Sequence, residues 1–409
     1  MKEKIVGISI CMLMIATAVS SVSACTGFTY SDNENVFACH NEDWHDFFTL
    51  RFFPATEDRY GCMFIEVYIL RDDGVEQMYP FSGMNDQGLW YSMYATPYLE
   101  PVNDTEKPNY YDPYSYYRIH IGEPCLFKCS TIDEALDLMD NYNHNGWGEF
   151  QVLMAEGTGK SVIHEGDDLI YKEGNFQVVT NFLQTNPELG GYPCERYDTV
   201  VSMLENMTEP SVDYFADILN ATHKSKWYSW TCHSMVCDLS NQMMYLYYFG
   251  DYEKQVVIDL NEELQKGEHS IFLGSLFEPE GNQPPNKPQP PIGNESGVTG
   301  EYLEYFAIRT SDPDGDKISY QFDWGDGDLS FWLFTVQGTI SSSHKWNKKG
   351  TYEVRVKAMD QYGAESEWSD PLEVTLPKNK GFIFNFPLLN WLFERFPNVF
   401  PTLRHMLWL

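Results

Sequence analysis

The chain has 409 residues, 43% of them hydrophobic, which is enough to build two domains that each bury a core. Its 60 acidic residues outnumber its 27 basic ones, so the formal net charge is −33 at pH 7. We therefore expect no nucleic-acid partner, because an acidic surface repels phosphates, and we expect good solubility outside the cell.

Residues 1–24 have the pattern of a removable signal peptide. Lys2 and Lys4 give a positive start, residues 5–18 form an apolar run, and small residues lead to a cleavage site after Ala24. The apolar run is too short and wrongly flanked for a membrane span, so an uncleaved anchor is the less favoured alternative. The pattern predicts a secreted or cell-surface protein.

Cys25 would become the first residue of the mature chain. It would then carry a thiol, which is a nucleophile, and a free α-amino group, which can act as its base near neutral pH. A competing interpretation comes from residues 22–25, whose sequence VSAC also resembles a lipobox, the signal for attaching lipid to a cysteine. Lipid attachment would consume the thiol, and this short pattern alone leaves both interpretations open.

Residues 25–277 have the pattern of a mixed domain of helices and strands. Short apolar runs predict the strands, and apolar residues at helical spacing predict the helices. Thr131, followed by Glu134 three residues later, forms a capping box at the start of one helix. Strands are predicted at residues 63–70, 151–155, 161–164, 176–179 and 243–249, and helices at residues 131–142 and 196–205.

The rest of the chain divides into a linker, a second domain and a tail. Residues 278–297 are rich in proline and predict an extended, semi-rigid linker. Residues 298–377 contain short strands and turn signals, the pattern of a β-sandwich. The tail, residues 378–409, is apolar but broken by prolines and charges, so we expect it to lie at a membrane interface or dock on a domain. The predicted strands of the sandwich are residues 302–308, 317–323, 339–346, 352–360 and 372–376.

Several short segments of the first domain occur in a recognisable order. Together they resemble the choloylglycine hydrolase and penicillin V acylase superfamily, the linear amide C–N hydrolases, over roughly residues 25–264. Each segment is short, but their order and spacing make the resemblance fairly specific. The segments are CTGF at residues 25–28, NEDW at residues 41–44, GMNDQGL at residues 83–89, VTNF at residues 179–182 and ERY at residues 195–197.

The resemblance implies a fold, a reaction and four catalytic residues. The fold is α+β, the four-layer αββα sandwich of N-terminal nucleophile hydrolases. Cys25 would attack the amide carbonyl of a small N-acylated substrate, with its own α-amine as the base. Asp43 would bind that amine, Asn181 would stabilise the oxyanion, and Arg196 would steady the region around Cys25 and Asp43.

The chain departs from the family pattern at two places. His40 stands where many members carry an arginine, and packing explains it as well as catalysis does. Bile-salt hydrolases and penicillin acylases also supply an oxyanion asparagine where this chain has Tyr94 and Ala95. The Tyr94 hydroxyl or a backbone N–H would have to replace that asparagine. We therefore expect a generic amidase of this superfamily rather than a true bile-salt hydrolase.

No cofactor or metal is expected in the first domain. Its cysteines lack the paired CxxC spacing of a structural zinc site, and its histidines lack metal-ligand spacing. In the second domain, Asp312, Asp314 and Asp316 offer oxygen ligands of the kind that bind Ca²⁺, although their spacing does not fit an EF-hand. A solvated acidic turn is the favoured interpretation of this cluster.

Motifs in the second domain resemble a PKD-type domain. PKD-like domains are immunoglobulin-like β-sandwiches of extracellular proteins, where they act as spacers or binding modules. The Asp-Gly turns and the alternating Trp324 and Trp346 agree with such a sandwich. The motifs are SDPDGD at residues 311–316, FDWGDG at residues 322–327, SHKW at residues 343–346 and KGTY at residues 349–352.

Three functions follow from these patterns. The favoured one is a secreted cysteine hydrolase of linear amides in small N-acylated molecules, because Cys25, Asp43, Asn181 and Arg196 all occur together. The second is a surface binding or adhesion protein with a decayed first domain, with contacts to a cell surface or membrane through the PKD-like domain and the tail. The third is a lipoprotein anchored through Cys25.

Overall fold

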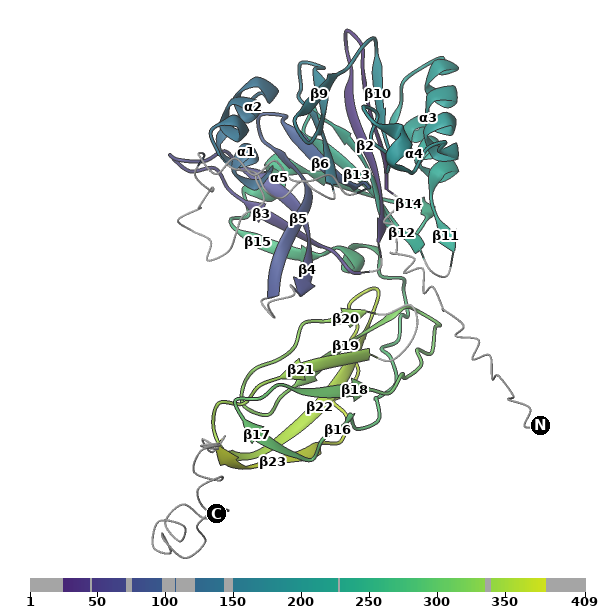
Figure 1. The fold of residues 1–409 in the computed structure, drawn as a ribbon. Helices are drawn as coiled ribbons and strands as arrows, with labels where there is room; N and C mark the ends of the chain where they lie inside the picture. The colour runs from purple at the N-terminus through teal and green to yellow at the C-terminus, as the bar shows by residue number, and fades with distance from the viewer. Residues whose placement is uncertain are drawn as a thin grey trace, which may run out of the picture.

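The computed structural model describes residues 25–44, 46–70, 76–97, 107, 122–142, 150–226, 229–334 and 340–379. The predicted signal peptide and residues 380–409 of the predicted tail lie outside these described residues. The described chain forms a larger part, built from β1 to β15 and the helices, and a smaller part built from β16 to β23 (Figure 1).

A seven-stranded antiparallel sheet contains the predicted nucleophile. Its strands follow the order β10-β1-β2-β12-β13-β14, and β11 pairs with β12 off this path. β1 pairs with β10 along one edge and with β2 along the other, and its residues 26–30 are buried on both faces. The strands are β1 (Thr26–Ser31), β2 (Val36–Trp44), β10 (Phe176–Val179), β11 (Ser225–Lys226), β12 (Ser229–Asp238), β13 (Met243–Tyr248) and β14 (Asp251–Asp259).

An eight-stranded antiparallel sheet faces the first one. Its strand order is β15-β3-β4-β5-β6-β7-β8-β9, so most neighbours in space are also neighbours in sequence. The strands are β3 (Thr49–Phe53), β4 (Cys62–Leu70), β5 (Glu76–Asn85), β6 (Trp90–Ala95), β7 (Phe150–Ala155), β8 (Ser161–Glu165), β9 (Asp168–Tyr171) and β15 (His269–Phe272).

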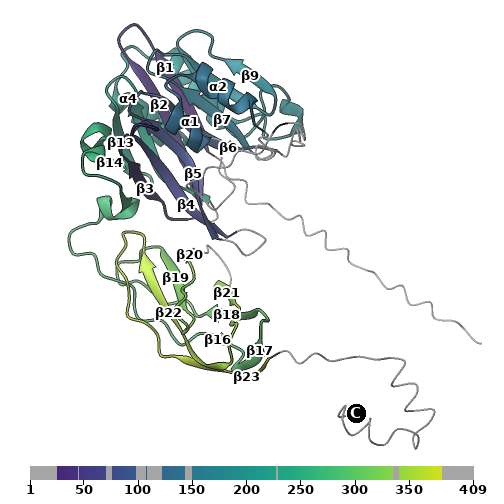
Figure 2. The ribbon, with the colours of Figure 1, turned by 90° about the vertical axis from the view of Figure 1, so that its left-hand side faces the viewer.

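Two pairs of helices lie on opposite sides of the larger part (Figures 1 and 2). α1 (Gly122–Lys128) and α2 (Ile132–Asp140) pack on the eight-stranded sheet, and α3 (Glu195–Glu205) and α4 (Val212–Thr222) pack on the seven-stranded sheet. The shorter helical elements are η1 (Pro187–Leu189), which precedes α3, and α5 (Leu260–Leu264) and η2 (Leu273–Phe277), which follow α4. None of the helices in the described ranges is long and apolar enough to cross a membrane.

Strand alternation divides the buried side chains into separate cores. Ala38 of β2 joins the core between the two sheets, whereas its neighbours Phe37 and Cys39 join the core under α3 and α4. Cys25 belongs to the core between the sheets, together with Trp90 of the facing sheet. On the inner face of β2, the side chains of Ala38, His40 and Glu42 are therefore buried.

The smaller part is a β-sandwich, as its strand pattern predicts. Its two sheets have the orders β16-β18-β21 and β17-β23-β22-β19-β20, and Trp324 and Trp346 are buried between them. β16 and the start of β17 lie inside the range predicted to be a linker. The strands are β16 (Ile292–Gly293), β17 (Ser296–Thr299), β18 (Leu303–Ala307), β19 (Ile318–Asp323), β20 (Leu333–Phe334), β21 (Ile340–His344), β22 (Gly350–Asp360) and β23 (Leu372–Asn379).

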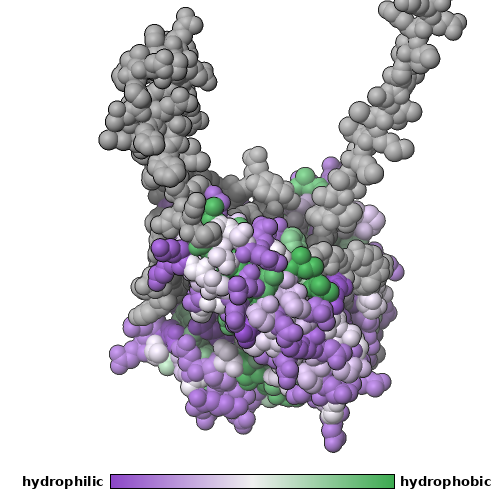
Figure 3. Space-filling view, turned by 90° about the horizontal axis from the view of Figure 1, so that it is seen from below, coloured by the Kyte–Doolittle hydropathy of each residue, from purple (hydrophilic) through white to green (hydrophobic). Residues whose placement is uncertain are grey.

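The sandwich packs against the larger part through aromatic side chains. The Phe334 ring lies 5.5 Å from the rings of both Phe47 and Trp230, and the Lys317 ammonium group lies 4.0 Å from the centre of the Phe249 ring. A groove of about 680 Å³ lies at this junction. Seen from the sandwich end, the described surface is mostly hydrophilic, with small hydrophobic patches (Figure 3), as the acidic composition implies.

Candidate functional site

Cys25 directly precedes strand β1, and its thiol lies on the inner face of the sheet. Gly27 of β1 pairs with His40 of β2, so strand alternation places Cys25, His40 and Glu42 on the same face. The Cys25 side chain is 1% exposed, and its thiol donates a hydrogen bond to Glu42 Oε1 at 3.3 Å. The predicted nucleophile is therefore buried against a carboxyl group.

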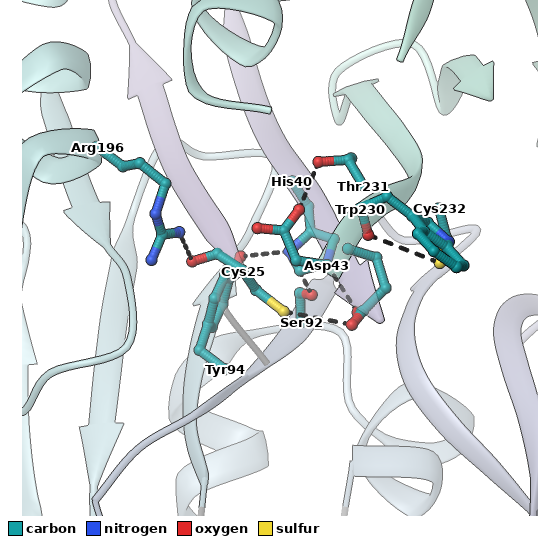
Figure 4. Close-up of polar contacts among 10 residues, drawn as sticks. Cys25, His40, Asp43, Ser92, Tyr94, Arg196, Trp230, Thr231 and Cys232 are labelled. Atoms are coloured by element: carbon teal, nitrogen blue, oxygen red, sulfur yellow. Dashed lines mark hydrogen bonds and ion pairs between the residues drawn. The ribbon is translucent and has the colours of Figure 1, made fainter. Parts of the chain in front are cut away.

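A chain of hydrogen bonds continues from Glu42 to the facing sheet. Glu42 Oε2 lies 3.0 Å from His40 Nε2, and His40 Nδ1 lies 3.0 Å from Tyr94 Oη and 3.1 Å from Ser92 Oγ (Figure 4). Burial lowers the pKa of His40 to about 3 and raises the pKa of Glu42 to about 8. Both groups are therefore neutral at pH 7.

Tyr94 fills the space above Gly27. A Cβ atom on Gly27 would lie 1.9 Å from Tyr94 Oη, so a glycine is required for the ring to approach β1 this closely. Burial raises the pKa of Tyr94 well above its usual value, so the hydroxyl keeps its proton. This hydroxyl engages His40, and the predicted role of Tyr94 in the oxyanion site stays a prediction.

Arg196 connects the start of β1 to Asn181. The arginine lies in the first turn of α3, and its Nη1 donates to Cys25 O and to Thr26 Oγ1, each at 2.6 Å. Its Nη2 donates to Asn181 Oδ1 at 2.8 Å. One planar guanidinium therefore fixes both the backbone of the predicted nucleophile and the predicted oxyanion donor.

Asn181 joins the two sheets at the level of Cys25. It follows β10, whose Val179 pairs with Gly27 of β1, and its Nδ2 donates to Ala95 O at 2.8 Å. Ala95 thus enters the site through its backbone carbonyl at the end of β6. Because Arg196 holds the other end of the Asn181 amide, its orientation is fixed. That this amide serves the oxyanion stays a prediction.

Asp43 occupies a separate buried position beside this group. Its Oδ1 accepts a hydrogen bond of 2.5 Å from Thr231 Oγ1, on the neighbouring strand β12. Burial raises the pKa of Asp43 to about 7, and the Thr231 hydrogen bond and the charges of Arg196 and Lys224 oppose that shift. The structure thus joins Cys25, Asn181 and Arg196 directly and places Asp43 within reach of the Arg196 charge.

Three polar residues of the site were not assigned a role from the sequence. Glu42 stands inside the NEDW segment, and its spacing of two from His40 is the signal that both share one face of a strand. Ser92 and Thr231 come from strands that pairing brings near, and sequence alone carries no comparable signal for them.

The GMNDQGL segment builds a turn rather than the catalytic group. Asn85 Nδ2 donates to Leu126 O at 2.9 Å and to Cys129 O at 2.8 Å, at the end of α1. Asn85 Oδ1 accepts from the backbone N–H groups of Gln87 and Leu89. This asparagine therefore ties the turn between β5 and β6 to α1.

The acidic cluster of the sandwich has a different membership from the predicted one. Carboxylate oxygens of Asp312, Asp316 and Asp360 lie within 4.8 Å of one another, whereas Asp314 accepts a hydrogen bond of 2.8 Å from the backbone of Gln283. In the larger part, the Cys25, His40 and Glu42 atoms also cluster. These atoms form hydrogen bonds with one another, so we interpret them as a hydrogen-bond chain and not as the ligands of a metal ion.

Comparisons with known proteins identify the smaller part. Residues 285–376 match the family described as the PKD domain, so the chain carries a PKD domain there. Collagenase ColA of Clostridium perfringens is 29% identical over 93 residues, which cover 22% of this chain and 8% of the collagenase. The chain therefore spans a small fraction of that relative's length.

Two solved PKD domains are also similar to the chain. The PKD domain of an M14-like peptidase from Thermoplasmatales archaeon SCGC AB-540-F20 is 43% identical and covers 24% of this chain and 99% of that chain, with a TM-score of 0.22. The PKD1 domain of Vibrio anguillarum Epp is 26% identical and covers 22% of this chain and 100% of that chain, with a TM-score of 0.16.

Proposed function

We propose that the protein is a secreted cysteine hydrolase that cleaves linear amide bonds of small N-acylated molecules. One observation carries this proposal. Cys25, the residue that removal of residues 1–24 would make N-terminal, directly precedes β1, and it is bound through its thiol by the buried Glu42 and through its carbonyl by the half-buried Arg196. A buried cysteine with only a packing role needs no hydrogen-bond partner for its thiol.

The arrangement of layers supports the fold implied by the family resemblance. Two antiparallel sheets enclose one core, and separate helix pairs cover their outer faces through two further cores. We assign this part of the chain to the αββα fold of N-terminal nucleophile hydrolases on that basis.

The reaction would proceed by covalent catalysis. The free α-amine of Cys25 takes the thiol proton, and the sulfur forms a bond to the substrate carbonyl carbon. Asn181 then donates its amide to the oxyanion, which is worth about 3 kcal/mol in comparable sites. As the C–N bond breaks, the ammonium returns the proton to the leaving amine, and water hydrolyses the thioester. Asp43 would hold the ammonium, and Arg196 would keep Cys25 and Asn181 in their positions relative to each other.

We place this activity outside the cell. The signal-peptide pattern of residues 1–24 supports export, and the PKD domain and the similarity to a segment of a collagenase agree with it. The PKD domain would act as a spacer or a binding module.

A substrate panel tests the proposed function. The mature protein should hydrolyse at least one member of a panel of N-acyl amides, and Cys25→Ser should lower kcat/KM by about 10³-fold or more, because the nucleophile is lost. Cys194→Ser is the matched control. Cys194 is buried at the N-cap of α3, where serine is well tolerated, so this variant should keep its activity.

Two outcomes would favour the alternative functions. Failure of the unaltered protein to cleave any panel member would favour a binding or adhesion protein. N-terminal sequencing of the exported protein should give the free sequence CTGF, and a blocked, lipid-bearing Cys25 would instead identify a lipoprotein.

A further inference from the structure

We infer that Glu42 is a positioning residue that aims the Cys25 thiol, and that His40 and Tyr94 in turn hold Glu42 in place. This inference rests on the proposed function, in which Cys25 is the nucleophile. Glu42 has no part in the mechanism outlined above, yet the Cys25 thiol donates a hydrogen bond to it.

The burial of Glu42 argues for a role in chemistry. Its side chain is 0% exposed, on the inner face of β2, where Ala38 contributes to the largest apolar core. A buried carboxyl group is destabilising relative to a well-packed apolar side chain, unless its oxygens are used. Both Glu42 oxygens are used, one by the Cys25 thiol and the other by His40.

The hydrogen-bond chain fixes the direction of the Glu42 carboxyl group. His40 is neutral, so one ring nitrogen donates and the other accepts. Its Nδ1 faces two hydroxyl groups of β6, from Tyr94 and Ser92, and its Nε2 faces Glu42. The facing sheet therefore sets the orientation of His40, and His40 sets that of Glu42. The thiol is held by a group that cannot rotate freely.

The charge state of Glu42 acts on the thiol as well. Below about pH 8 the carboxyl group is neutral and does not oppose formation of a thiolate. Above that pH its negative charge, next to the sulfur, disfavours the thiolate. The pKa values of His40 and His233 are both lowered, so neither supplies a positive charge there. Among the described residues, the titratable groups around Glu42 are Cys25 just before β1, His40 and Asp43 from β2, Tyr94 from β6, and Cys232 and His233 from β12.

Titration of the thiol tests the inference without any substrate. Thiolate absorbance of the mature protein, minus that of its Cys25→Ser variant, reports the ionisation of Cys25. The same comparison is then made between Glu42→Gln and the double variant Glu42→Gln/Cys25→Ser. The pKa of the Cys25 thiol should be lower by about 1 unit or more in Glu42→Gln, because no carboxylate can form beside the sulfur. An unchanged titration in this background would overturn the inference.

Glu66→Gln is the matched control. Glu66 is also a buried carboxyl group with a raised pKa of about 7, but it lies on β4 and pairs with Arg51. Its replacement should leave the Cys25 titration unchanged. A shift equal to that of Glu42→Gln would mean that the effect is general to buried acids, which also overturns the inference.

Kinetics separate positioning from a merely structural role. With an amide that the unaltered protein cleaves, Glu42→Gln should keep KM and lose the fall in kcat above about pH 8. Glu42→Ala should lower kcat about 10- to 100-fold, because the thiol is no longer aimed. A full kcat in Glu42→Ala would contradict positioning. If Glu42→Gln fails to fold, His40→Gln replaces it in the titration and should also shift the Cys25 ionisation.

The two proposals fail in different ways. If no amide is cleaved, the proposed function fails, and the thiol titration still decides whether Glu42 faces and tunes Cys25. If amides are cleaved and the titration does not respond to Glu42, the proposed function stands and this inference fails.

Discussion

Arg196 connects three groups of the candidate site. Its guanidinium donates to Cys25 O, Thr26 Oγ1 and Asn181 Oδ1, so it connects the beginning of β1 to the segment after β10. Arginine provides several donors in a rigid fork, whereas lysine provides a single point charge.

Replacement of Arg196 by lysine should therefore lower kcat more than it raises KM. We expect kcat to fall about 10- to 100-fold, because lysine cannot bind Cys25 and Asn181 at the same time in the geometry that the guanidinium provides. Steady-state kinetics on a cleaved amide checks this. Arg355→Lys, at an exposed arginine of the PKD domain that pairs with Glu353, is the control and should leave kcat unchanged. Equal kcat values for the two variants would contradict the role of Arg196.

At the level of elements, the site depends on how closely β1 approaches β6. Gly27 makes that approach possible, because any side chain there would meet the Tyr94 ring. The same contact places Tyr94 Oη beside His40. A change at Gly27 should thus affect the packing of the two sheets. It should also disturb the hydrogen bonds that run from Tyr94 through His40 to Glu42.

Gly27→Ala should destabilise the protein by about 1–3 kcal/mol through overpacking. The midpoint of denaturant-induced unfolding measures this, and the activity should fall with it as Tyr94 is displaced. Gly157→Ala is the control, because its added Cβ would lie 3.5 Å from its nearest neighbour, an ordinary contact. A Gly27→Ala variant as stable as the control would contradict this prediction, because it would show that the two sheets can move apart with no loss of stability.

Several elements follow from local sequence pattern, and others do not. β10 at Phe176–Val179 and α3 at Glu195–Glu205 agree with the predicted ranges within one residue, because apolar spacing and local signals specify them. Thr131 caps α2 as predicted, and its side chain accepts from the Glu134 N–H. β1 is harder to predict, because it is buried on both faces and shows no alternation of apolar and polar residues.

The candidate site shows the same division. The sequence resemblance selects Cys25, Asn181 and Arg196, which the structure joins by hydrogen bonds. It gives no role to Glu42, because a contact between a thiol and a carboxyl group depends on the register of β1 with β2. The link from His40 to Ser92 depends on two sheets meeting face to face, which no local pattern specifies.

At the scale of the whole molecule, the PKD domain contacts the strand that supports Asp43. Phe334 of the PKD domain packs on Trp230, and the next residue of β12, Thr231, donates to Asp43. The predicted linker also packs against the sandwich, since Asn286 N donates to Ser311 O at 2.9 Å. Such contacts hold the proline-rich segment, which the sequence predicted to be an extended, semi-rigid linker, against the sandwich.

Processing of the whole chain is central to the account, because removal of residues 1–24 would create the base that activates Cys25. The most direct test compares kcat/KM of two purified proteins, one that begins at Cys25 and one that carries a single extra glycine before it. The extra residue converts the amine into an amide, so we predict a loss of about 10²- to 10⁴-fold, the usual contribution of a general base. Equal activity of the two proteins would contradict the proposed mechanism.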